Sequence, residues 1–114
     1  MITVIKSPFV QYKLTILRNK KTSNTVFRQT MNEISYLIAS DVLQYVPFKK
    51  QTIETPLKKM SGTALGQPII LVPILRAGLG LLEGFAKFLP EAEKGHIGLY
   101  RDEQTYEPVE YLFK

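Results

Sequence analysis

The sequence predicts an α/β fold in which N-terminal helices are followed by a β-arm and then by a central parallel β-α-β unit. Residues 1–50 place their apolar side chains at helical spacing, whereas residues 51–67 are polar and contain two glycines. From residue 68 to residue 114, an apolar stretch, a helical pattern and a second apolar stretch follow one another. That order is typical of a parallel unit with a crossover helix, and 114 residues suffice for one domain.

Two helices are expected in residues 1–50. The stretch "SPFVQYKLTILRN" predicts the first one, with Pro8 in its first turn. Ser23 or Asn24 can cap the second helix, which must end before Pro47 because that ring disfavours α geometry in the preceding residue. The positions at helical spacing that support these helices are Phe9, Tyr12 or Lys13, Ile16 and Leu17 in the first, and Phe27, Met31, Ile34, Ile38 and Val42 in the second.

Residues 51–67 read as a polar hairpin or an extended arm. The stretches "QTIETPL" and "SGTALGQ" flank "KKM", and neither is strongly apolar. We therefore expect this arm to be exposed or to pair with a partner subunit.

The last third of the chain predicts the sheet. Residues Ile69–Leu75 are apolar at successive positions, which is typical of a strand buried between two layers. A helix is expected to end near Pro90, followed by the strand Gly95–Tyr100 and by a third strand in "EPVEYLFK". The helix rests on the spacing of Leu79, Leu82, Phe85, Ala86 and Leu89.

Composition narrows the function classes. Fifteen Lys and Arg against ten Asp and Glu give a net charge of +5, which suits phosphorylated metabolites or nucleic acid, or is simply a solvated surface. The absence of cysteine excludes disulfides and thiolate metal sites and fits a cytoplasmic protein, and one histidine cannot form a metal cluster. The sequence contains no run of 18 apolar residues, so no membrane span is predicted. The start of the chain does not resemble a signal peptide.

One candidate anion site lies at Arg76, where a strand is expected to turn into a helix. Free N–H groups at a helix start favour negative charge, and a guanidinium offers paired donors. Gly78 and Gly80 would let the backbone approach a phosphate. The alternative is a tight turn with a surface arginine. The spacing Gly78-x-Gly80-x-x-x-Gly84 departs from the dinucleotide fingerprint, so we reject a nicotinamide site.

A second candidate is Arg101, which directly follows the expected strand 95–100. Ligands of open α/β sheets bind outside the carboxyl ends of strands, so Arg76 and Arg101 are expected on adjacent strands, facing one crevice. Such a pair would suit a substrate with several phosphates. The alternative for Arg101 is an ion pair with Asp102 or Glu103. His96 lies inside a strand and is interpreted as a packing residue, so no acid or base catalyst is identified.

Several stretches resemble the N-terminal half of the uracil phosphoribosyltransferase family. The most specific are "VPILRAGLGLLEGF" and "GLYRDEQTYEPVEYLFK", and "SPFVQYKLTILRN", "TSNTVFRQTMNEISYLIASD" and "IETPL" precede them in the same order. The resemblance implies a type I phosphoribosyltransferase (Rossmann-like) fold. It also implies transfer of ribose 5-phosphate from phosphoribosyl pyrophosphate to uracil, which yields UMP and pyrophosphate.

The resemblance also implies which residues bind. "PILRAG" corresponds to the pyrophosphate loop, so Arg76, Ala77, Gly78 and Arg101 are expected to bind phosphoribosyl pyrophosphate. Mg²⁺ is expected as a cofactor held through the pyrophosphate, with no metal ligand from the chain. Pyrophosphate loops of related folds often contain a non-proline cis peptide, and we expect one near Arg76. Binding of GTP is a further possibility within the family.

The sequence departs from the family pattern in what it lacks. The family's 5-phosphate loop joins acidic residues to a Thr-Gly-Gly-Ser-like stretch, yet the only aspartates are Asp41 and Asp102, and no such stretch follows either. The glycine- and aspartate-rich uracil segment is absent as well. We interpret residues 1–114 as a C-terminally incomplete phosphoribosyltransferase domain that is inactive alone and takes uracil only when the missing half is supplied.

Two other interpretations stay open. The chain could be a non-catalytic regulator that binds RNA, although no aromatic and basic motif of an RNA module occurs. It could also be an interface fragment that docks to a full-length enzyme. We expect a homodimer formed through the β-arm, and neither a membrane nor a nucleic acid as partner.

Overall fold

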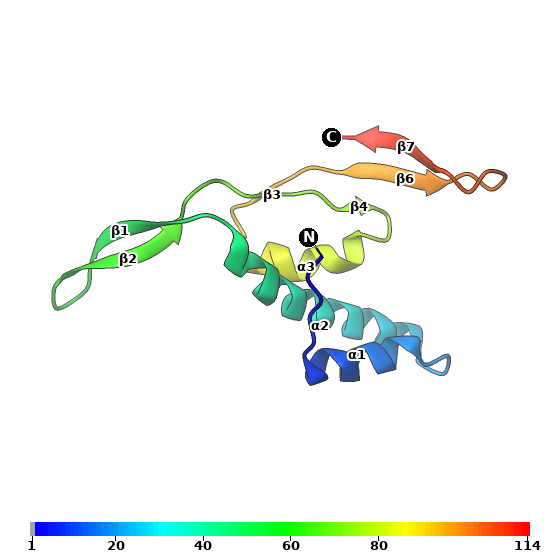
Figure 1. The fold of residues 1–114 in the computed structure, drawn as a ribbon, viewed down its shortest axis with the longest axis horizontal. Coiled ribbons are helices and arrows are strands. Elements are labelled where there is room, and N and C mark those ends of the chain that lie inside the picture. Colours follow the sequence, from blue (N-terminus) through cyan, green and yellow to red (C-terminus); the bar gives the residue numbers. More distant parts are fainter. Residues whose placement is uncertain (1) are drawn as a thin grey trace.

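The structure is a computed structural model that describes residues 2–114. Three helices lie in a stack on one side of the strands, and a two-stranded arm projects away from them (Figure 1). The elements in chain order are α1 (Pro8–Arg18), α2 (Asn24–Val42), the 3₁₀ turn η1 (Leu43–Tyr45), β1 (Phe48–Glu54), β2 (Lys59–Leu65), β3 (Ile70–Leu71), β4 (Ile74–Leu75), α3 (Leu79–Phe88), β5 (Glu93–Lys94), β6 (Ile97–Arg101) and β7 (Pro108–Phe113). None of the helices within residues 2–114 has the length and apolar character needed to cross a bilayer.

Both N-terminal helices form as predicted. α1 begins at Pro8, which occupies the first turn. Ser23 caps α2, since its side-chain oxygen accepts a hydrogen bond from the Val26 amide at 3.2 Å. α2 ends at Val42, and one 3₁₀ turn carries the chain on to Pro47.

The core lies where α3 crosses α2. A Cβ atom on Gly84 would fall 2.4–2.5 Å from backbone atoms of Ser35, so only glycine permits this approach. The Gly84 amide donates to Ser35 Oγ at 2.9 Å, and the Ser35 hydroxyl donates to the Asn32 carbonyl at 2.6 Å. Beside this contact, Ile34 and Ala39 are buried. α1 is joined to α2 by the ion pair of Lys13 and Glu33, at 2.6 Å.

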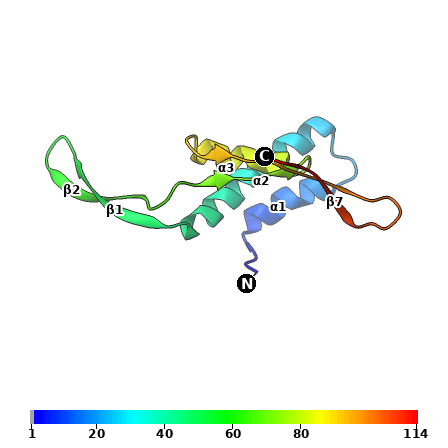
Figure 2. The same cartoon turned by 90° about the horizontal axis from the view of Figure 1, so that it is seen from above.

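The β-arm is an antiparallel hairpin that starts earlier than expected. β1 begins at Phe48 rather than at Gln51, because Phe48 pairs with Leu65 and the Gly66 amide donates to the Pro47 carbonyl. Every residue of β1 is exposed, and Figures 1 and 2 show the hairpin extending away from the helices. The arm is thus exposed within this chain, and its pairing with a partner subunit stays a prediction.

The parallel unit forms as predicted, with one interruption. β3 pairs with β5 and β4 with β6, in both cases parallel, while β7 adds to β6 as an antiparallel strand. The expected strand 69–75 is divided into β3 and β4 because Pro73 has no amide hydrogen to donate. The Pro73 carbonyl still accepts a hydrogen bond from the Ile97 amide at 3.3 Å, so the two short ladders continue each other.

The prediction that strand 69–75 is buried between two layers is wrong for residues 2–114. Ile70, Val72 and Ile74 are exposed to 62%, 46% and 50%, whereas Pro73, which alternates with them, is buried. α3 lies against one face of these strands, and no described element covers the other face (Figure 1). The apolar pattern on both faces is real, but within this chain only one face is covered.

Candidate functional site

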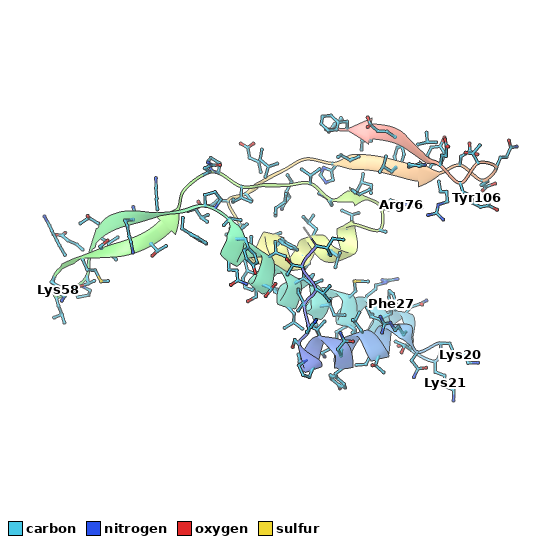
Figure 3. The ribbon with its side chains drawn as sticks, in the orientation of Figure 1. Lys20, Lys21, Phe27, Lys58, Arg76 and Tyr106 are labelled. Atoms are coloured by element: carbon cyan, nitrogen blue, oxygen red, sulfur yellow. The ribbon has the colours of Figure 1, made fainter. Side chains whose placement is uncertain are left out.

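Arg76 lies in the turn between β4 and α3, as the sequence predicts. The peptide bond between Leu75 and Arg76 is cis, which confirms the expectation drawn from the family resemblance. The turn is closed by the Gly78 amide, which donates to the Ile74 carbonyl at 2.7 Å, and by the Leu79 amide, which donates to the Arg76 carbonyl at 3.1 Å. The Arg76 side chain is exposed at the end of the sheet (Figure 3).

The glycines of this turn have a packing role that the sequence did not reveal. A Cβ atom on Gly78 would lie 2.5 Å from the Ile74 carbonyl oxygen, and one on Gly80 would lie 3.2 Å from Met31 Cγ. The Gly78 amide is already used within the turn, so it is not available to an anion in this conformation. Within residues 2–114, the backbone amides of Arg76 and Ala77 donate no hydrogen bond, so these two amides can donate to a ligand.

Arg101 is the last residue of β6, the neighbour of β4. The two strands run parallel with Leu75 opposite Gly98, so Arg76 and Arg101 lie at the carboxyl ends of adjacent parallel strands, as predicted. Beside Arg101 is an open cavity of about 320 Å³. Its lining residues are Leu99, Tyr100, Arg101, Tyr106 and Pro108. Arg76 is not among them, so a crevice shared by both guanidiniums stays a prediction.

The alternative for Arg101, an ion pair with a neighbouring acid, is not found. The only salt bridge among the described residues 2–114 joins Lys13 to Glu33. Asp102 instead accepts hydrogen bonds at Oδ1 from the amides of Gln104 at 2.8 Å and Thr105 at 2.9 Å. These bonds, that of Thr105 foremost, hold the pKa of the Asp102 carboxyl below its ordinary value. Arg101 is therefore an exposed cation without a carboxylate partner in the described part of the chain.

Tyr106 is a residue of this cavity that sequence reasoning missed. It lies in the turn between β6 and β7 with φ of 59°, a left-handed conformation that is uncommon for a bulky residue. Tyr106 lies within the family-specific stretch "GLYRDEQTYEPVEYLFK", but nothing in that stretch distinguishes it as a binding residue. His96, by contrast, exchanges backbone hydrogen bonds with Lys114 and is half-buried, and its interpretation as a packing residue stays a prediction.

Residues that could hold a metal are sparse around this site. Within residues 2–114, no three His, Cys, Asp or Glu side chains gather closely enough to form a metal site. Asp102, which directly follows Arg101, already directs one carboxylate oxygen to two turn amides.

Comparisons with known proteins agree on one family. The family model for uracil phosphoribosyltransferase matches residues 4–114. Curated uracil phosphoribosyltransferases from Levilactobacillus brevis and Lactiplantibacillus plantarum are 47% and 48% identical over 112 residues, covering 97% of this chain and 54% of each relative. The relative from Streptococcus pneumoniae is 46% identical over 114 residues.

A solved structure agrees as well. The AQ2163 protein from Aquifex aeolicus superposes with a TM-score of 0.90 at 30% identity, over 100% of this chain and 55% of that one. The chain therefore spans about half the length of the relatives it matches. Since the family model covers nearly all of its residues, the chain belongs to the uracil phosphoribosyltransferase family.

Proposed function

We propose that this chain forms the pyrophosphate side of a uracil phosphoribosyltransferase site. The enzyme would transfer ribose 5-phosphate from phosphoribosyl pyrophosphate to uracil and release pyrophosphate, with UMP as product. The observation that carries the proposal is the placement of Arg76 and Arg101 at the carboxyl ends of adjacent parallel strands, β4 and β6. Ligands of open α/β sheets bind at this edge.

The chemistry assigned to these residues is stabilisation of the leaving group. As the bond from ribose C1 to the pyrophosphate oxygen breaks, C1 becomes cation-like and negative charge gathers on pyrophosphate. Arg76 and Arg101 would bind that charge, together with the free amides of Arg76 and Ala77, and so lower the barrier. Uracil N1 then bonds to C1 and loses its proton. No residue of this chain is assigned as the base that takes it.

Magnesium would enter this site as part of the substrate. Pyrophosphate oxygens are the hard ligands that Mg²⁺ prefers, and the ion usually retains several waters. The chain's own contribution is the pair of guanidiniums that bind the same pyrophosphate.

We further propose that the chain is cytoplasmic and dimerises through the β-arm. A lone two-stranded hairpin is marginally stable in water, and β1 and β2 here pack mainly on each other. The cross-strand pair Phe48 and Leu65 is exposed on one face of the hairpin, and the pair Ile53 and Met60 is exposed on the other face, which we take as the interface. A second copy would cover this surface.

The first test is the binding of pyrophosphate with Mg²⁺ to the 114-residue polypeptide. We expect Arg76→Ala and Arg101→Ala each to weaken binding about tenfold or more, since each removes a charge-assisted hydrogen-bonding group. Lys21→Ala is the matched control: it removes one positive charge from the α1–α2 turn, away from Arg76 (Figure 3), and should leave affinity unchanged. Equal binding by Arg76→Ala and the parent would contradict the proposal.

The same polypeptide should form no UMP from uracil, phosphoribosyl pyrophosphate and Mg²⁺ above a control without protein. Proximity and orientation supply about 7–11 kcal/mol of barrier reduction only when both reactants are held. These 114 residues contain neither the family's 5-phosphate loop nor its uracil segment. Turnover that disappears in Arg76→Ala would show that they hold more of the site than we assign.

A further inference from the structure

The turn between β6 and β7 is organised by a single carboxylate. Asp102 Oδ1 accepts from the amides of Gln104 and Thr105 at 2.8 and 2.9 Å, while its backbone amide donates to the Glu107 carbonyl at 2.8 Å. The Tyr106 amide donates to the Asp102 carbonyl, also at 2.8 Å. Both the side chain and the backbone of Asp102 therefore define the path of residues 102–107.

This turn carries Tyr106 to the cavity beside Arg101. Arg101 in β6 pairs with Pro108 in β7, so the turn begins at the residue that follows Arg101. Tyr106, held at a φ of 59°, lines the cavity together with Arg101. Arg76 and Tyr106 lie at the same end of the molecule (Figure 3), and Tyr106 is 70% exposed, so its hydroxyl is free to donate to a ligand.

We propose that Asp102 is a positioning residue: it fixes the turn so that the Tyr106 hydroxyl and the Arg101 guanidinium face the same phosphoryl anion. Tyr106 then adds a hydrogen-bond donor to the site. This inference rests on the proposed function, because the anion is taken to be the pyrophosphate of its substrate. The turn geometry itself does not depend on the ligand.

Two substitutions at Asp102 separate positioning from electrostatics. Asp102→Asn keeps a side-chain oxygen for the two amides and removes a negative charge near the anion, so pyrophosphate should bind at least as tightly as to the parent. Asp102→Ala removes the same charge but also the acceptor, so the turn should lose its geometry and the affinity should fall about three- to tenfold. A purely repulsive role of the carboxylate would instead make both variants bind more tightly.

The experiment is an NMR titration of the 114-residue chain with pyrophosphate and Mg²⁺, in which amide signals of Gln104, Thr105 and Tyr106 report the turn. Tyr106→Phe should weaken binding about threefold or more, by loss of one hydroxyl, without moving the signals of Gln104 and Thr105. The signal of the Gly84 amide, far from the turn in sequence, serves as the folding control in every variant.

The outcomes are distinguishable. An Asp102→Ala chain that binds pyrophosphate as tightly as the parent, or keeps the parent turn signals, overturns the positioning role and leaves the proposed function intact. A parent chain that binds no pyrophosphate removes the anion site itself, and the positioning role with it. Weaker binding by Asp102→Ala and binding by Asp102→Asn that equals or exceeds that of the parent, together with the loss of turn signals in Asp102→Ala alone, support the proposal.

Discussion

At the scale of single residues, the glycines differ in whether their surroundings leave room for a Cβ atom. Gly84 and Gly78 are required by backbone that lies too close for any Cβ atom, at Ser35 and Ile74 respectively. Gly62 in β2 is different, since a Cβ atom there would meet the Gln51 carbonyl at an ordinary 3.6 Å. The neighbours in space, rather than the local sequence, decide which glycine tolerates a side chain.

Gly84→Ala is expected to destabilise the chain by about 1–3 kcal/mol, because the added methyl group forces α3 away from α2. It also strains the hydrogen bond from the Gly84 amide to Ser35 Oγ. Gly62→Ala is the control, and it should leave the free energy of unfolding nearly unchanged. Urea unfolding followed by circular dichroism measures both. Equal stability of the two variants would show that the helices separate at little cost.

The placement of Arg76 and Arg101 at the carboxyl ends of neighbouring strands could be predicted from the sequence. Each arginine directly follows an apolar stretch, and the carboxyl ends of parallel strands lie on the same side of a sheet. The geometry of the turns that follow β4 and β6 could not be predicted from the sequence. The sequence predicts that the backbone at Gly78 approaches a phosphate, but the Gly78 amide donates to the Ile74 carbonyl. Tyr106 reaches the cavity beside Arg101 through a left-handed backbone in a turn held by four hydrogen bonds of Asp102, and no sequence spacing encodes that.

At the scale of elements, the type and order of the helices and strands could be predicted from the sequence. The exact boundaries of the strands and the burial of their faces could not. Periodicity indicated α1, α2 and α3, and alternation indicated β7, because these patterns are local. The division of strand 69–75 arises from one missing amide at Pro73, and the exposure of its outer face depends on which layers are present. The β-arm shows the same limit: its strands follow from the sequence, but its isolation is a tertiary property.

The arm provides a test of the proposed dimer. Ile53 and Met60 form a cross-strand pair in the hairpin and are exposed to 41% and 44%. Ile53→Lys places a charge on this apolar surface and should shift the chain toward monomer in sedimentation equilibrium. Thr52→Lys adds the same charge to the opposite face of β1 and should leave the association unchanged. A parent chain that is monomeric at all concentrations would contradict the arm as interface.

At the scale of the whole molecule, the chain exposes far more surface than a compact domain. Its accessible surface is 9407 Å², against about 6,300 Å² for a compact monomer of 13.0 kDa. The radius of gyration is 18.2 Å, whereas about 13 Å is typical for this length. The projecting arm and the bare face of β3 and β4 fit this difference. That bare face, with Ile70, Val72 and Ile74, is where a second layer would bury apolar surface.

The central claim is that these residues form the pyrophosphate half of a uracil phosphoribosyltransferase site. Its most direct test is a hybrid in which residues 1–114 are fused to the segment that follows the matched region in the Levilactobacillus brevis relative, 47% identical to this chain. The hybrid should form UMP from uracil and phosphoribosyl pyrophosphate. Arg76→Ala should lower its kcat/KM about tenfold or more, and Lys21→Ala should not change it. A folded hybrid without activity, or one whose Arg76→Ala variant is fully active, would contradict the claim.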